Sequence, residues 1–402
     1  MMEKQAKVTV IVPTRERPDT LVHCLQTLLT QDYENLTILV SDNLSQDQTP
    51  DVVASFNDKR LRYINTGKRI SMSHNWEFAL SHVDSGWVTF QGDDDGLLPG
   101  AIALLNDIIT EFPCEAVNSM ACTYFWPYNG RSNGASLAVP TAKEGIAYLK
   151  SRALLASVMA GRKSYKQLPC LYAGGFATIE AINRASSSNG SFFMSRMPDV
   201  YSGIALSSVT EQFLRIGTPL AVVGASAHSN AVAANFNKFL SEENIPFHPS
   251  LIFGKTYRLL IYECYLQSHF LHHDCLALSL KDQLELALAY NGMEPRKAIR
   301  EQCERIAELN GIKFSRTSLS SLSRLIKASI IRQASRLGNV PGRKLLLGED
   351  AAGRNVFEAS LKASEVISAA NSRSTLTNSL QNIMAELRPR AVARRLNLLR
   401  YE

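Results

Sequence analysis

The first hundred residues alternate short apolar runs with segments of helical periodicity. The apolar runs, rich in β-branched residues, span 8–13, 36–40, 61–64 and 87–90. The segments between them carry apolar residues at helical spacing, as at Leu21, Leu25 and Leu28. Continuous apolar runs are typical of strands covered on both faces, and strands separated by helices form right-handed βαβ units. The pattern predicts an α/β fold with a mostly parallel sheet flanked by helices.

This regular alternation ends near residue 110. From 111 to 235, aromatic strand-like pieces mix with Gly and Ser turns, and beyond 235 the chain reads as a series of helices. At 402 residues the chain is long enough for two to three domains. We therefore expect a first domain over 1–235, with halves 1–110 and 111–235, followed by a helical, basic C-terminal region over 236–402.

Three polar clusters follow strands of the predicted sheet. They are Pro13-Thr14-Arg15 after the first strand, Asp42-Asn43 after the second, and Asp93-Asp94-Asp95 after the fourth. In an open parallel sheet, ligands bind beyond the carboxyl ends of the strands. The three clusters are therefore predicted to form one binding site.

The triple aspartate is the most specific of these signals. Adjacent carboxylates repel one another, so Asp93, Asp94 and Asp95 favour a counter-ion at the strand end. A hard divalent cation, Mn²⁺ or Mg²⁺, binds to a few carboxylates together with substrate phosphates. The alternative is a solvated acidic turn in which Gly92 and Gly96 permit tight backbone geometry.

The first two clusters suit a nucleotide. Asp42 and Asn43 present the acceptor and donor groups that a base edge such as uracil requires, although an Asx-turn closing the loop is the alternative. Thr14 and Arg15 are candidates to hold the base and a phosphate, and capping or surface roles are equally open.

Further candidates follow the third strand. Lys68 and Arg69 are placed to reach a diphosphate, with a solvated pair of charges as the alternative. His74 and Asn75 on the next helix are candidates to line a sugar pocket, and ordinary helix-surface roles remain open.

The clusters in this order resemble a known family. The motifs are Val8 to Thr14, then Val40-Ser41-Asp42-Asn43-Leu44-Ser45 with Asp47 and Thr49, then Phe90 to Pro99. Over about the first 110 residues they resemble the N-terminal half of a family 2 glycosyltransferase. The resemblance implies the GT-A fold, a nucleotide-sugar donor, metal and diphosphate at the aspartate-rich motif, and the base held after the first two strands. UDP is the expected nucleotide. Because Asn43 and His74 depart from the usual family pattern, dTDP and GDP stay open.

An inverting sugar transfer needs a carboxylate that removes the proton of the acceptor hydroxyl. Asp199, after Pro198 and before an apolar helix, is our candidate for this base, and a helix N-cap is its alternative role. Glu211 is the second candidate, with a solvated helix face as its alternative. His228 follows the strand at 220–223, and the resemblance implies that it completes the metal shell, whereas a purely structural histidine is the alternative.

The C-terminal region is basic. Residues 311–402 hold sixteen Lys and Arg against six Asp and Glu, and 311–348 hold eight basic residues and no acidic one. The helix expected over 318–337 is amphipathic, and such a helix binds an anionic membrane surface or packs on the first domain with its basic face outward. Membrane contact would suit a lipid-linked acceptor. Aromatic residues are not interleaved with these charges, which argues against nucleic acid as a partner.

The remaining signals favour a cytoplasmic enzyme. The seven cysteines are scattered without a CxxC pair, and the short apolar run 8–13 does not suit a signal peptide. We expect a cytoplasmic glycosyltransferase, in contact with the inner face of a membrane if the basic segment binds there, acting in surface polysaccharide or lipid-linked glycan synthesis. A sugar nucleotidyltransferase is one alternative, although Thr14 to Arg17 lacks the glycines that such an enzyme needs there. A non-catalytic nucleotide-sugar binding module is the other.

Overall fold

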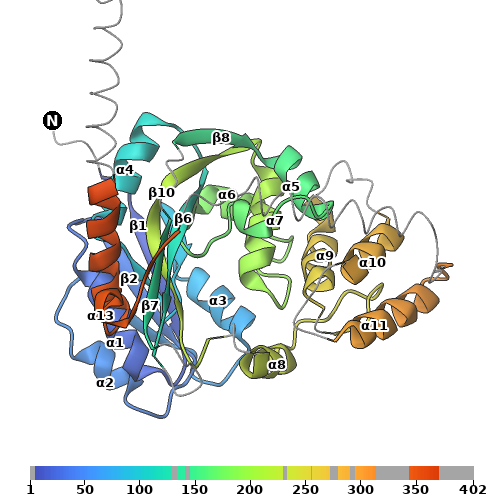
Figure 1. Ribbon diagram of the computed structural model, residues 1–402, viewed down its shortest axis with the longest axis horizontal. Coiled ribbons are helices and arrows are strands. Elements are labelled where there is room, and N and C mark those ends of the chain that lie inside the picture. The colour runs from blue at the N-terminus through green and yellow to red at the C-terminus, as the bar shows by residue number, and fades with distance from the viewer. Residues whose placement is uncertain are drawn as a thin grey trace, which may run out of the picture.

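In a computed structural model of the chain, the fold is a central sheet with helices on both faces (Figure 1). The structure describes residues 5–127, 134–140, 145–229, 233–254, 256–271, 279–289, 295–313 and 344–370. The predicted α/β class is confirmed for these residues, and the C-terminal region is mostly helical with one further strand of the sheet.

The N-terminal half of the sheet is parallel, as the sequence predicts. Its elements are β1 (Val8–Thr14), α1 (Pro18–Leu29), β2 (Leu36–Asp42), α2 (Thr49–Ala54), β3 (Leu61–Asn65), α3 (Met72–Leu80) and β4 (Trp87–Phe90). The strands lie in the order β4-β1-β2-β3, and every pair is parallel. In β1 every residue except Pro13 is buried, because helices cover both faces of this strand. The carboxyl ends of β1, β2 and β4 therefore meet at one edge of the sheet.

The rest of the sheet is mixed rather than parallel. Its elements are β5 (Gly96–Leu97), α4 (Ala101–Glu111), β6 (Ala116–Phe125), β7 (Ser136–Pro140), β8 (Ile146–Lys150), α5 (Ser151–Met159), the 3₁₀ helix η1 (Tyr165–Gln167), β9 (Gly175–Thr178), α6 (Ile179–Arg184), α7 (Pro198–Val209) and β10 (Gln212–Ala225). Strand β9 enters antiparallel between β4 and β6, and β6 pairs antiparallel with β7. The connection from β6 to β7 is too short for a crossover helix, so the two strands run in opposite directions. The expectation of a mostly parallel sheet therefore holds for the first half only.

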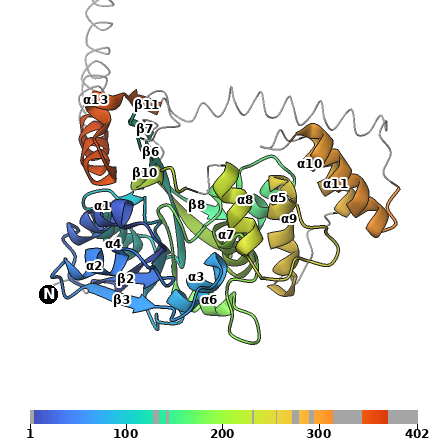
Figure 2. The same cartoon turned by 90° about the horizontal axis from the view of Figure 1, so that it is seen from below.

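The C-terminal part contributes to both ends of the molecule. Its described elements are α8 (Ala233–Glu242), α9 (Tyr257–Gln267), the 3₁₀ helix η2 (His269–Leu271), α10 (Leu280–Ala289), α11 (Arg296–Leu309), β11 (Lys344–Leu347), α13 (Glu349–Ala352) and a helix over 356–370. Helices α9 to α11 lie at one end, whereas β11 pairs antiparallel with β7 at the edge of the sheet and α13 lies beside it (Figures 1 and 2). The domain boundary near residue 235 stays a prediction. Most of the basic segment 311–348 lies outside the described residues.

Two hydrophobic clusters cover the two faces of the sheet. One joins Trp76 and Phe90 to α7 and to α9–α11, so the C-terminal helices share a core with the sheet. The other joins β1, α1 and α4 to the helix over 356–370, through residues such as Val356 and Ala359. Among the described residues, no helix is both long and apolar enough to cross a bilayer.

Candidate functional site

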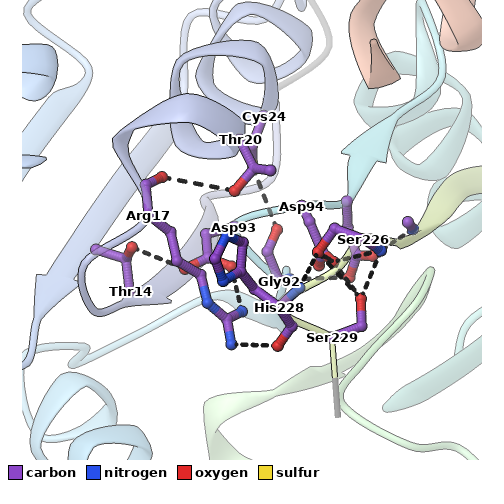
Figure 3. Close-up of polar contacts among 12 residues, drawn as sticks. Thr14, Arg17, Thr20, Cys24, Gly92, Asp93, Asp94, Ser226, His228 and Ser229 are labelled. Carbon is purple, nitrogen blue, oxygen red and sulfur yellow. Dashed lines mark hydrogen bonds and ion pairs between the residues drawn. The ribbon is translucent and has the colours of Figure 1, made fainter. Parts of the chain in front are cut away.

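Asp93 lies in the turn after β4, beside the loop that follows β1. It is 2% exposed, and its Oδ2 accepts a hydrogen bond of 2.8 Å from the hydroxyl of Thr14. Its Oδ1 accepts one of 2.8 Å from the guanidinium of Arg17 (Figure 3). Burial raises the pKa of Asp93, while the positive charge of Arg17 opposes that rise. Two of the three predicted clusters therefore meet in direct contact.

Asp94 connects the same turn to the loop that follows β10. Its Oδ2 accepts hydrogen bonds from the Ser226 hydroxyl at 2.6 Å, from the Ser226 amide at 3.3 Å, and from the Ser229 hydroxyl (Figure 3). Its backbone carbonyl accepts one of 3.0 Å from the indole of Trp126. The loop that contains His228 is thus bound to the aspartate turn.

Asp95 is fully buried and held by three donors. Its Oδ2 accepts hydrogen bonds from the Tyr172 hydroxyl at 2.6 Å and the Gly92 amide at 3.0 Å, and its Oδ1 accepts one of 2.6 Å from the Gly224 amide. Burial, followed by the charge of Asp94, raises the pKa of Asp95 to about 8. Asp95 therefore fixes the turn to β10 and to the loop before β9.

Asp42 and Asn43 lie after β2 and are both hydrogen-bonded within the fold. Asp42 accepts from Ser45 at its Oδ1 and, at its Oδ2, from the Tyr63 hydroxyl at 2.6 Å and from Asn65 at 3.2 Å. The side-chain amide of Asn43 donates to the backbone carbonyl of Ile70 at 2.7 Å and accepts from its amide at 2.9 Å. Asn43 thus holds the loop after β3 in place. The contact of Asn43 with a base stays a prediction.

The basic candidates lie around the same edge of the sheet. Arg15 forms an ion pair of 2.9 Å with Glu242 at the end of α8, and Arg69 lies 3.4 Å from Glu16. Lys68 is exposed and Pro13 is partly buried at the end of β1. Asn75 is buried and bonds both to the hydroxyl and to the carbonyl of Ser41, so its side chain secures α3 to β2.

Asp199 lies in the first turn of α7 and is partly exposed. The hydroxyl of Tyr165 is 3.5 Å from its Oδ2. Burial raises the pKa of Asp199, and the charge of Lys166 opposes that rise. Burial raises the pKa of Tyr172, and the charges of Asp95, Asp94 and Asp199 raise it further, so this tyrosine lies within electrostatic reach of these carboxylates.

Glu211 lies away from the aspartate turn. It is exposed, directly precedes β10, and forms an ion pair of 2.7 Å with Lys150, which lowers the pKa of Glu211. The full length of β10 separates it from Ser226, which contacts Asp94. Of the two carboxylates considered as base, the structure therefore leaves Asp199 as the candidate.

His228 contacts Arg17 beside the turn through its backbone, while its imidazole lies beside Asp19. Its carbonyl accepts a hydrogen bond of 2.7 Å from Arg17, and its Nε2 lies 3.9 Å from Asp19. Within the described part of the chain, no three His, Cys, Asp or Glu side chains are grouped as a metal site requires. The metal-ligand set of Asp93, Asp94, Asp95 and His228 stays a prediction.

Several residues at the site were not assigned from the sequence. Arg17, Tyr63, Ser226 and Ser229 all contact the predicted aspartates. Arg17 belongs to the same turn as Thr14 and Arg15, and that position is the only signal that pointed to it. Ser226 and Ser229 flank the candidate His228, but their residue type alone does not predict a contact with the aspartates.

Comparison with known proteins shows what this region is similar to. The family described as "Glycosyl transferase family 2" matches residues 9–149, a segment that contains β1 to β4 and the aspartate turn. Residues 9–149 are therefore similar to glycosyl transferase family 2. The sequence resemblance over the first 110 residues is thereby confirmed.

Two curated relatives match the same N-terminal part. A GalNAc(5)-diNAcBac-PP-undecaprenol beta-1,3-glucosyltransferase of Campylobacter jejuni is 36% identical over 102 residues, which is 25% of this chain and 33% of the relative. The glycosyltransferase GlyA of Streptococcus pneumoniae is 29% identical over 111 residues, 27% of this chain and 16% of the relative. The chain thus spans a third or less of the length of these relatives.

Two solved structures show a distant likeness over most of the chain. TarS 1–349 of S. aureus in complex with UDP-GlcNAc is 15% identical, with a TM-score of 0.45 over 83% of this chain and 92% of that chain. The mannosyltransferase PcManGT of Pyrobaculum calidifontis in complex with GDP-Man and Mn²⁺ is 19% identical, with a TM-score of 0.38 over 82% and 87% of the two chains.

Proposed function

We propose that the chain is a glycosyltransferase that moves one sugar from a nucleoside-diphosphate sugar to a hydroxyl acceptor with inversion. Residues 1–235 form the catalytic domain, and UDP is the nucleotide of the donor. The observation that carries this proposal is the buried turn Asp93–Asp95 at the carboxyl end of β4, inside the family 2 region. Three adjacent buried carboxylates cost free energy unless a cation lies beside them.

The chemistry of the turn fits Mn²⁺ or Mg²⁺, because both ions prefer carboxylate oxygens. Asp94 Oδ2 accepts its hydrogen bonds from Ser226 and Ser229, while Oδ1 accepts none from any residue that the structure describes. We propose Asp93, Asp94, Asp95 and His228 as the ligands. A bound divalent ion neutralises negative charge on the departing diphosphate.

Asp199 is the base of the proposed transfer. Its carboxylate takes the proton of the acceptor hydroxyl while that oxygen forms a bond to the anomeric carbon. The bond from this carbon to the diphosphate oxygen breaks on the opposite face, and the nucleoside diphosphate leaves with the electron pair. The raised pKa of Asp199 suits this role, since a stronger base accepts the proton more readily at neutral pH.

The nucleotide contacts that we propose lie at the ends of β1 to β3. Asp42 accepts from the base, and Tyr63 and Asn65 hold its carboxylate in place. Thr14, with Pro13 and Arg15, borders the base and phosphate. Lys68 and Arg69 reach the diphosphate from the exposed loop, and Asn43 and Asn75 shape that edge through Ile70 and Ser41.

The proposed acceptor is a lipid-linked glycan or a growing surface polysaccharide. The support is the relative from Campylobacter jejuni, whose name describes an undecaprenol-linked glycan. We also propose that the enzyme acts at the cytoplasmic side of a membrane and contacts that membrane through residues 311–348.

The experiment is a release assay with purified protein and a panel of UDP-, dTDP- and GDP-sugars, with and without Mn²⁺, in the presence of lipid-linked glycan acceptors. We expect release of one nucleoside diphosphate and a matching acceptor product, both dependent on the metal. Nucleotide binding without any release would contradict catalysis and favour a binding module. Pyrophosphate formation from a sugar phosphate and a nucleoside triphosphate would favour a nucleotidyltransferase.

A further inference from the structure

Arg17 is the cation that the fold itself places at the aspartate turn. It occupies the N-cap position of α1 but forms no side-chain cap, so its guanidinium is available for other contacts. One terminal nitrogen donates to Asp93 Oδ1 at 2.8 Å and the other to the carbonyl of His228 at 2.7 Å (Figure 3). Its side chain is 27% exposed, so solvent and ligands reach it.

The backbone of the β1–α1 loop aims Arg17 and Arg15 at different partners. Glu16 between them has a φ of 55°, in the left-handed region that non-glycine residues seldom adopt. Its amide donates to the Ser45 hydroxyl at 2.8 Å, which secures this conformation. Arg15 consequently pairs with Glu242, while Arg17 reaches Asp93.

The charge of Arg17 is well suited to the turn. Burial lowers the pKa of Arg17, but the charges of Asp93 and Asp94 together with the hydrogen bond to Asp93 produce a net rise, so the guanidinium stays protonated. Among the described residues, Arg17 is the one basic side chain that forms an ion pair with a carboxylate of the turn. It offsets part of the cost of burying Asp93 in the ligand-free protein.

We propose that Arg17 exchanges partners when the donor binds. In the free protein it is the counter-charge of Asp93, and in the donor complex its guanidinium leaves Asp93 and binds the diphosphate. This inference rests on the proposed function. Asp93 Oδ1 cannot bind a guanidinium and a divalent ion well at the same time, because the two positive charges repel each other. A guanidinium released beside a diphosphate has a preferred partner there, since its planar fork matches phosphate oxygens.

The exchange predicts opposite effects of one substitution on two ligands. Without nucleotide, Arg17→Gln removes a competitor of the metal, so we expect Mn²⁺ to bind about tenfold more tightly in calorimetry, as expected for losing one charged hydrogen bond. At saturating Mn²⁺, the same variant lacks a diphosphate contact, so we expect UDP to bind about tenfold more weakly. Arg184→Gln is the matched control, because it removes an exposed arginine that pairs with Glu115 at 2.8 Å. It should change neither affinity.

Arg17→Lys keeps the proposal testable if Arg17→Gln does not fold. It retains the charge beside Asp93 without the planar fork, so we expect near-native Mn²⁺ affinity and weakened UDP binding. Unchanged or weaker Mn²⁺ binding by Arg17→Gln, or unchanged UDP binding by both variants, would overturn the exchange. Turnover in wild type without Mn²⁺ uptake would overturn the exchange and leave sugar transfer standing. Absence of nucleotide binding and turnover in wild type would overturn the proposed function as well.

Discussion

The hydroxyl of Tyr172 donates a hydrogen bond of 2.6 Å to Asp95 Oδ2. This contact joins the loop before β9 to the aspartate turn after β4. The adjacent backbone supports it, because Tyr172 forms an isolated parallel bridge with Phe90, whose ring stacks on Trp76 at 4.2 Å. Besides burial, the charge of Asp199 also raises the pKa of Tyr172, so this tyrosine lies within the electrostatic field of the proposed base as well.

Replacing Tyr172 with Phe tests this link. The change removes one donor from a buried carboxylate, so we expect a loss of about 1–2 kcal/mol in the free energy of unfolding and weaker metal-dependent binding of UDP. Chemical denaturation and calorimetry measure the two effects. The control is Tyr148→Phe, which removes an exposed hydroxyl that donates to the Pro113 carbonyl at 3.1 Å. Equal stability and equal UDP affinity in the two variants would contradict the link.

Asp199→Asn separates binding from chemistry. The amide keeps the shape of the side chain but accepts no proton, so we expect kcat to fall by about 10²–10⁴ while UDP affinity stays within twofold of wild type, the usual range for loss of a general base. Steady-state kinetics and calorimetry measure the two quantities. Glu211→Gln, on an exposed carboxylate at the far end of β10, should retain most of the activity. A comparable loss in Glu211→Gln would reverse our choice of base.

The pH profile of the reaction should report Asp199. Because burial raises the pKa of this carboxyl, the acidic limb of kcat/KM should lie above the usual aspartate range, with activity falling as the pH drops through that raised value. The same shift means that the stabilising effect of the protonated form is lost as the pH rises through the folded-state pKa. Asp199→Asn should therefore lose less stability between acidic and neutral pH than wild type. An acidic limb within the ordinary aspartate range would contradict the assignment.

Gly224 marks the closest approach of β10 to the turn. A Cβ atom there would lie 1.8 Å from the carbonyl oxygen of Asp94, while the Gly224 amide donates to Asp95. Gly224→Ala must therefore push the two segments apart, and we expect a loss of about 1–3 kcal/mol in unfolding free energy together with weaker UDP binding. Gly145→Ala, where a Cβ would meet nothing within 4 Å, is the control. A fully stable Gly224→Ala with normal binding would contradict the close contact.

The parallel half of the sheet was predictable from the sequence because its strands are buried on both faces. The runs at 8–13, 36–40 and 87–90 coincide with β1, β2 and β4, and their ends meet as the topology requires. The mixed half of the sheet was not predictable from the sequence, because its strand order depends on long-range pairing. Short strands such as β9 and β11 have no periodicity of their own that specifies a partner.

The contacts of the site also fall into a group that the sequence predicts and a group that it does not. The contact between Thr14 and Asp93 follows from two motifs at the ends of neighbouring strands. By contrast, Ser226 and Tyr172 reach Asp94 and Asp95 from more than seventy residues away, and no local pattern assigns their side chains to these carboxylates. The direction of the Arg17 side chain depends on the left-handed backbone at Glu16. Glutamate seldom adopts a positive φ, so the sequence does not predict this conformation.

The most direct test of the proposed metal and diphosphate site is an anomalous difference map from a crystal soaked with UDP and MnCl₂. We expect a manganese peak beside the carboxylates of Asp93 and Asp94, a diphosphate next to it, and Arg17 turned from Asp93 to a phosphate oxygen. A well-ordered UDP bound elsewhere, with the turn free of manganese and Arg17 still paired with Asp93, would contradict it.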